Sequence, residues 1–198
     1  KGRSSEEVED AIKDQDKDTL SDLERAATQE LSRVAIVDEA IHLDEMARVM
    51  DEATAWWGCS PNFCMIDYLE LLPGGDADSV GVTSKAQAVK RWAKEQRVPV
   101  GLVHQSGRGS SPPGHAAGLY GGRYGGEHEA IFVLEVYRKK DRNDLSHWES
   151  QYHANSINLN LCKNKRTAKV LDQTYYMDPV CGHVHPYHEE LIPDTAQV

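Results

Sequence analysis

This chain of 198 residues lacks the sequence features of membrane-spanning, secreted and disulfide-rich proteins. It contains no run of about 18 apolar residues, which excludes a membrane-spanning helix. Residues 1–18 include no apolar segment, so we expect no secretory signal. The four cysteines are too few for a disulfide framework in a chain of this length, which favours a reducing, cytoplasmic setting.

The overall charge of −10 conceals an uneven distribution. Residues 1–55 carry seven Lys and Arg against sixteen Asp and Glu, whereas residues 85–142 carry eleven against five. A further basic cluster contains Lys163, Lys165 and Arg166. Positive local potential favours partners that bear phosphate. A solvated helix face is the simpler interpretation of one subset: Lys85, Lys90 and Lys94.

The hydrophobic pattern alternates between helical and strand-like segments. Helices are predicted at residues 4–30 (as one exposed helix or a helical pair), 43–57 and 80–97; strands at 33–38, 63–72, 98–104, 130–140, 156–165 and 168–178. This order predicts an α/β fold with a mainly parallel sheet flanked by helices and a C-terminal antiparallel hairpin.

Two polar residues end predicted buried strands. Asp67 follows Phe63–Ile66, and Gln105 follows the strand at 98–104. Ligands of parallel sheets bind at the carboxyl ends of the strands, where an acid can hold Mg²⁺ through water and an amide can sense a phosphate. Taken alone, Asp67 is better interpreted as an acid that caps the following turn, and the structural alternative for Gln105 is a simple strand-end polar residue. We favour the structural interpretation for Asp38 as well.

The order of these segments is more specific than any one of them. The sequence FCMIDYLELL, followed by AKEQRVPVGLVHQSGRG, resembles the second half of the RecA-like ATPase domain of DnaB-type hexameric replicative helicases. The resemblance covers about residues 31–185, and RecA and RadA recombination ATPases share parts of it. It implies a RecA-like P-loop NTPase core that uses ATP and Mg²⁺.

The resemblance also implies roles for individual residues. Asp67 matches the Walker B acid that binds Mg²⁺, and Gln105 matches the glutamine that senses the γ-phosphate. Lys163 and Lys165 match the two positions of a basic "KxR" finger that enters the neighbouring subunit's nucleotide site. Lys165 stands where the family has Arg, so Arg166 is an alternative finger.

The Gly-rich stretch at 106–126 corresponds to the family's DNA-contacting loop. There, four residues would bind DNA through charge or stacking: Arg108, Tyr120, Arg123 and Tyr124. Plain disorder explains the composition equally well. The resemblance assigns no role to Glu127.

One departure from the family is the lack of a G-x-x-x-x-G-K-[ST] motif, which cradles phosphates. We therefore expect a fragment without the first strand and P-loop unit, although a protein that has lost nucleotide binding is the alternative. The predicted division is an acidic helical segment at 1–30, the RecA-like portion at 31–187 and a flexible tail at 188–198.

Three functions follow from the resemblance. The first is a helicase subunit that assembles as a homo-hexamer or another ring on single-stranded or branched DNA. The second is a recombination or junction-processing ATPase, and the third is a non-catalytic DNA-binding or assembly module. Separately, Cys181, His183, His185 and His188 invite a Zn²⁺ hypothesis, but their spacing fits no standard motif and coincidence is the preferred interpretation.

Overall fold

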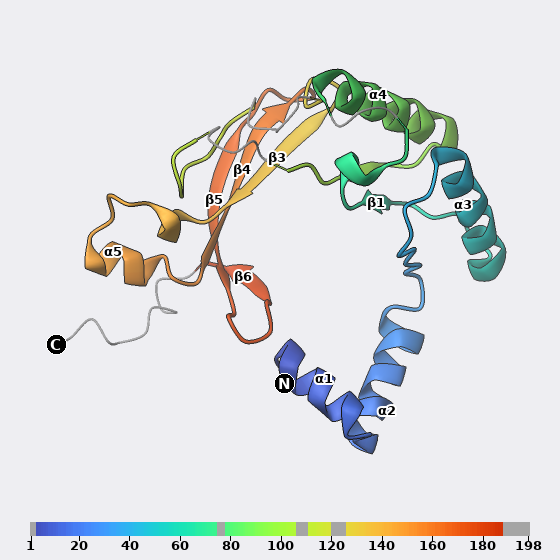
Figure 1. Ribbon diagram of the computed structural model, residues 1–198, viewed down its shortest axis with the longest axis horizontal. Coiled ribbons are helices and arrows are strands. Elements are labelled where there is room, and N and C mark those ends of the chain that lie inside the picture. The colour runs from blue at the N-terminus through green and yellow to red at the C-terminus, as the bar shows by residue number, and fades with distance from the viewer. Residues whose placement is uncertain (1–2, 75–77, 106–110, 120–125, 188–198) are drawn as a thin grey trace.

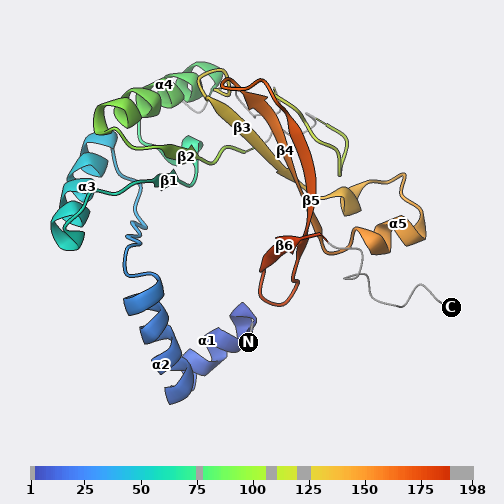
Figure 2. The same ribbon diagram turned by 180° about the vertical axis from the view of Figure 1, so that it is seen from behind.

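The computed structural model describes residues 3–74, 78–105, 111–119 and 126–187 (Figure 1). The helices are α1 Ser5–Lys13, α2 Lys17–Arg25, α3 Leu43–Trp57, α4 Ser79–Gln96 and α5 His147–Tyr152. The strands are β1 Cys64–Ile66, β2 Val100–Leu102, β3 Phe132–Tyr137, β4 Ser156–Asn164, β5 Leu171–Met177 and β6 Val184–Pro186. Short helical turns cover Ala26–Glu30, Leu69–Leu71 and Lys139–Asp141. The elements follow an open arc, with α4 between α3 and the larger sheet (Figures 1 and 2).

The described strands form two separate sheets. Strands β1 and β2 pair in parallel, and β3, β4, β5 and β6 form an antiparallel sheet in that order. The predicted α/β fold with parallel pairing and an antiparallel C-terminal part is confirmed. The antiparallel part is larger than the expected hairpin, because β3 pairs with β4 and β6 adds a fourth strand.

The core lies where α4 crosses the turn after β1. Val82 and Ala86 of α4 pack with Leu69, and all three side chains are buried. Asp78 caps the N-terminus of α4, and its carboxylate accepts the backbone N–H of Gly81 at 2.7 Å. Because its buried residues recur at helical spacing, the helix presents one apolar face to the core, as the sequence predicts.

The predicted strand at 33–38 is wrong. These residues form no strand, and Val34 and Ile36 are 55% and 85% exposed. An isolated run with β propensity gains its stability only from cross-strand neighbours, and no described strand pairs with it. Within 4–30 the prediction of a helical pair is confirmed, with α1 and α2 joined by a short turn.

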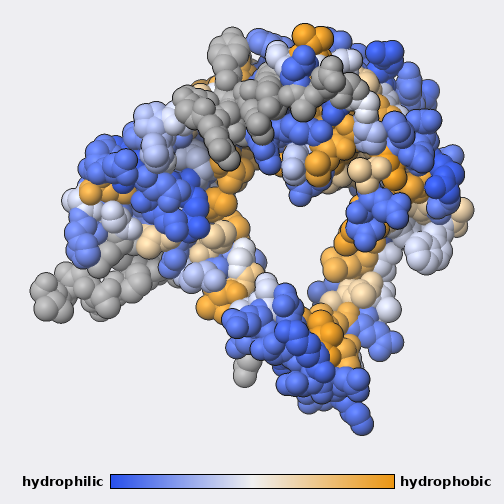
Figure 3. Space-filling view, in the orientation of Figure 1, coloured by the Kyte–Doolittle hydropathy of each residue, from blue (hydrophilic) through white to orange (hydrophobic). Residues whose placement is uncertain are grey.

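Part of the sheet surface is not covered by any described segment. Phe132, Leu134 and Val136 alternate along one face of β3, and each is at least half exposed. Among the described strands, β2 pairs only with β1, and β3 pairs only with β4. Figure 3 shows further hydrophobic surface along the N-terminal helices and the segment that leads to α3. No described helix is both long and apolar enough to cross a bilayer.

Candidate nucleotide site

Asp67 and Gln105 lie beyond the carboxyl ends of the two parallel strands. Ile66 pairs with Leu102 in the β1–β2 register, so Asp67 comes one residue after the last pair and Gln105 three residues after it. Both side chains are exposed. The structure therefore brings these two predicted residues to the same edge of one sheet, where ligands of parallel sheets bind.

Hydrogen bonds between the two chain segments continue past the strands. The N–H of Val103 donates to the carbonyl of Ile66 at 2.9 Å, and the N–H of Leu69 donates to the carbonyl of Val103 at 2.8 Å. Leu69 is only 2% exposed and anchors the turn in the core. The segment that carries Asp67 is thus fixed on both sides.

Glu70 is a residue that sequence reasoning missed. One of its carboxylate oxygens, Oε1, lies 3.0 Å from Nδ1 of His104 and accepts the backbone N–H of Gln105 at 3.3 Å. Its carbonyl accepts a hydrogen bond from Nζ of Lys85 at 3.1 Å. Lys85 therefore does not lie on a purely solvated face. The signal in the sequence was a second acid three positions after Asp67.

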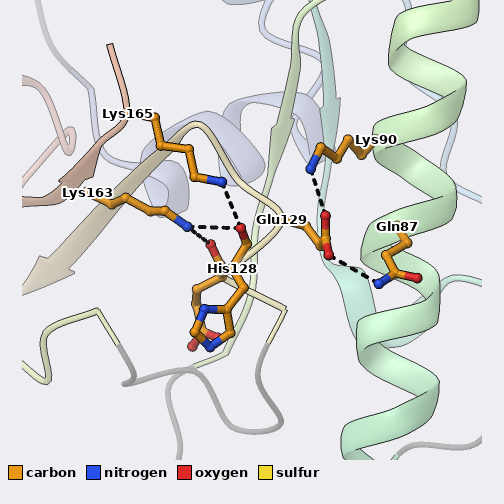
Figure 4. Close-up of polar contacts among 7 residues, drawn as sticks. Gln87, Lys90, His128, Glu129, Lys163 and Lys165 are labelled. Atoms are coloured by element: carbon orange, nitrogen blue, oxygen red, sulfur yellow. Dashed lines mark hydrogen bonds and ion pairs between the residues drawn. The ribbon is translucent and has the colours of Figure 1, made fainter. Parts of the chain in front are cut away.

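The basic cluster at the end of β4 is held against the loop before β3 (Figure 4). Nζ of Lys163 donates to the carbonyls of Glu127 and His128 at 2.7 and 3.0 Å, and Nζ of Lys165 donates to the His128 carbonyl at 3.0 Å. Burial, followed by the charge of Lys165, lowers the pKa of Lys163. Both lysines therefore turn back onto their own chain.

Arg166 is placed differently. It lies in the turn after β4, where its backbone N–H and that of Thr167 donate to the side-chain oxygen of Asn164, each at 3.1 Å. Its side chain is exposed and makes no hydrogen bond or ion pair within the described parts of the chain. Of the three candidate finger residues, Arg166 is the one whose charged group points to no partner in the described chain.

An ion pair connects α4 to the same loop. Nζ of Lys90 lies 2.7 Å from Oε2 of Glu129, and Gln87 donates to Oε1 at 3.1 Å (Figure 4). These hydrogen bonds, first from Lys90 and then from Gln87, lower the pKa of Glu129. Lys90 was expected on a solvated face, but its role in the structure is to hold the loop before β3.

Other predicted residues cannot be placed in the site. The four candidate DNA contacts (Arg108, Tyr120, Arg123 and Tyr124) lie outside the described residues, as does His188. Asp38 ends no strand. Among the described residues, no group of three or more His, Cys, Asp or Glu is arranged to hold a metal ion, and the rings of His183 and His185 lie 4.1 Å apart.

The residues at the sheet edge fit a hydrated magnesium ion. The Asp67 carboxylate is exposed and has no ion pair or hydrogen bond with any described residue. Mg²⁺ favours one or two carboxylates together with water and substrate phosphates. A single free carboxylate beside an exposed amide therefore suits Mg²⁺ bound with a nucleotide, rather than a cage made of protein ligands alone.

Comparisons with known proteins identify the fold. No protein-family model matches the chain, and no curated protein matches its sequence. Among solved structures, the chain is similar to RecA-like ATPase domains, and this class agrees with the parallel strands and the site edge described above. The predicted RecA-like core is confirmed at the level of fold.

Two of these solved structures illustrate the similarity of fold. One is the structure of a DnaB-like replicative helicase and its interactions with primase. The two sequences are 19% identical and the TM-score is 0.66; the similarity covers 86% of this chain and 42% of that chain. The other is the structure of an ATPase domain, which is 18% identical with a TM-score of 0.69; the similarity covers 93% of this chain and 66% of that chain. The chain has the fold of a DnaB-like C-terminal ATPase domain and spans less than half the length of the helicase.

Proposed function

We propose that the chain is part of the ATPase domain of a DnaB-like helicase subunit, which hydrolyses Mg²⁺-ATP at subunit interfaces and moves on single-stranded DNA. The observation that carries the proposal is the position of Asp67 and Gln105 at the carboxyl ends of adjacent parallel strands. Ligands of open α/β sheets bind at this edge. The similarity of the fold to RecA-like ATPase domains supports the interpretation of this sheet edge as a nucleotide-binding site.

In this proposal Asp67 holds the hydrated Mg²⁺, and Gln105 contacts the terminal phosphate or the attacking water. Mg²⁺ bound with the nucleotide neutralises charge that develops on the phosphates. Gln105 directly precedes the segment at 106–126, so a change at the phosphate would be passed to the proposed DNA-binding loop. That loop includes the candidate contacts Arg108, Tyr120, Arg123 and Tyr124.

We assign the finger that acts on a neighbouring subunit to Arg166. Lys163 and Lys165 are engaged with the carbonyls of residues 127 and 128, whereas the exposed Arg166 guanidinium has no partner among the described residues. A guanidinium can bind phosphate oxygens with two parallel hydrogen bonds, which an ammonium cannot do. The lysines then position the turn from which Arg166 projects. This arrangement requires a homo-hexamer or another ring.

The 198 residues contain no G-x-x-x-x-G-K-[ST] motif, and we propose that a further unit of the protein supplies the phosphate-binding loop. The uncovered edges of β2 and β3 and the exposed apolar side chains of β3 offer a surface on which such a unit would pack. We propose the same organisation as the sequence predicted: an acidic helical segment at 1–30, the RecA-like portion at 31–187 and a tail at 188–198, in a cytoplasmic protein.

The test is ATP hydrolysis by the full-length gene product, with and without single-stranded DNA. Asp67→Ala and Gln105→Ala are each expected to lower kcat by about a hundredfold or more, because each removes a group at the reacting phosphate. Asp51→Ala, which changes an exposed acid on α3, is the matched control and should retain wild-type turnover. Wild-type turnover in the Asp67→Ala protein would refute the site.

The lack of a Walker A motif in this sequence favours one alternative, a RecA-like DNA-binding or assembly module without ATPase activity. The same experiment separates the two. DNA binding that weakens with salt, in a full-length protein without ATP turnover, would support the binding module. A preference for branched DNA, combined with turnover, would instead indicate a recombination or junction-processing ATPase.

A further inference from the structure

Glu70 is a buried acid at the boundary between the two halves of the proposed nucleotide site. It lies in the short helical turn Leu69–Leu71 that follows Asp67, and its side chain is only 10% exposed. A carboxylate removed from water is costly unless other groups compensate for its charge. The burial of Glu70 therefore requires a physical explanation beyond packing.

The contacts of Glu70 join three segments of the chain. Oε1 accepts the N–H of Gln105 at 3.3 Å and lies 3.0 Å from Nδ1 of His104, whose side chain is 14% exposed. The carbonyl of Glu70 accepts a hydrogen bond from Lys85 of α4 at 3.1 Å. One residue thus connects the turn after β1, the end of β2 and helix α4.

We propose that Glu70 is a positioning residue that fixes Gln105 relative to Asp67. The main chain of Asp67 leads directly into the turn that contains Glu70, while the Glu70 carboxylate holds the backbone of Gln105. The magnesium-binding side and the phosphate-sensing side of the site are consequently held as one unit. The inference rests on the proposed function for its catalytic consequence, but the contact itself is independent of that function.

A purely structural role explains the geometry less well. Oε2 of Glu70 and both ring nitrogens of His104 are buried, and none of the three makes a hydrogen bond with the described residues, although Nδ1 of His104 lies 3.0 Å from Oε1 of Glu70. Replacing both members of a buried ion pair with apolar side chains of similar volume is often neutral or stabilising, so a pair of this kind is a poor device for stability alone. What the carboxylate does supply is a directed acceptor for one particular N–H, that of Gln105.

The first experiment uses NMR to measure the hydrogen-exchange rate of the Gln105 amide in the full chain. Glu70→Ala removes the acceptor and is expected to accelerate exchange of this amide by about tenfold. Glu70→Gln retains an acceptor oxygen and should restore protection. The Val103 amide, which donates to the carbonyl of Ile66, is the internal reference and should keep its wild-type rate in both variants.

Glu95→Ala is the matched control, since Glu95 is an exposed acid on α4. Unchanged exchange at Gln105 in the Glu70→Ala protein would overturn the proposal. Equal acceleration at Gln105 and Val103 would also overturn it, because that result would show general loosening of β2 rather than loss of one positioning contact.

The second measurement is steady-state ATP hydrolysis by the full-length protein. Glu70→Ala is expected to lower kcat by about tenfold or more and leave KM for ATP within about twofold, and Glu70→Gln should recover most of the loss. If the wild-type protein does not hydrolyse ATP, the proposed function fails while the exchange result still decides the contact. If it does, an unchanged kcat in Glu70→Ala would overturn the positioning role.

Discussion

Two leucines in the same helical turn should differ sharply in their contribution to stability. Leu69 is 2% exposed and packs against α4, whereas Leu71, two residues later, is 55% exposed. Leu69→Ala removes three buried carbon atoms, a transfer loss of roughly 2.5 kcal/mol, and the cavity left behind brings the expected loss to about 3–4 kcal/mol. Leu71→Ala should lower the free energy of unfolding by less than about 0.5 kcal/mol.

Urea denaturation followed by circular dichroism measures the difference. With a slope of about 2 kcal/mol per molar urea, the midpoint of Leu69→Ala should fall by about 1.5–2 M, and that of Leu71→Ala should hardly move. The slope should be unchanged in both variants. Equal midpoint shifts for the two leucines would refute the conclusion that the turn after β1 is anchored in the core by Leu69.

Two further predictions concern a pair of glycines and a partly buried tyrosine. Gly114→Ala should destabilise the protein by about 2–4 kcal/mol, because a Cβ would lie 2.5 Å from the backbone N of Arg142 at a left-handed φ of +72°. Gly118→Ala should cost only about 1–2 kcal/mol, because Gly118 has a similar φ of +78° but no atom of the described residues lies within 4 Å of the added Cβ. Equal losses of stability in thermal melts of the two variants would contradict the clash. Burial, followed by the charge of Asp172, raises the pKa of Tyr137 to about 12, so its contribution to stability is present below pH about 10 and lost as pH rises through about 12. Asp172→Asn should lower this pKa only partly in an ultraviolet absorbance titration, and a fully normal value would show that burial is not the main cause.

Local signals in the sequence were sufficient for several parts of the fold. Helix α3 at 43–57 agrees with the prediction because its apolar spacing is helical and Gly58, in the left-handed conformation, ends it. Asp67 and Gln105 could be placed at one edge, since each follows a short apolar run and parallel strands align their carboxyl ends. In both cases neighbouring residues contain the information that determines the structure.

Predictions failed where the structure depends on distant neighbours. The run at 33–38 has the composition of a strand, but strand formation needs an adjacent edge that no described segment provides. The partners of Glu70 are 15 to 35 residues away, so only the folded chain shows that it contacts Lys85 and Gln105. The different orientations of Lys163 and Arg166 were likewise invisible in a row of adjacent basic residues.

Helix α4 links the proposed nucleotide site to the antiparallel sheet. No strand pairing joins the two sheets in the described parts of the chain. Contacts made by side chains of α4 connect the turn after β1 with the loop before β3. Lys85 binds the carbonyl of Glu70 beside the site, and Lys90 pairs with Glu129 in the loop that also receives Lys163 and Lys165.

Backbone packing reinforces this link. Gly126, at the start of that loop, approaches Leu69, Val82 and Ala86 so closely that a Cβ would lie 3.5–3.8 Å from their side chains. The turn after Asp67 and the loop beneath the basic cluster therefore contact the same face of α4. In the described parts of the chain, the two proposed ATP-contacting surfaces are thus connected through packed side chains of α4 rather than through a continuous sheet.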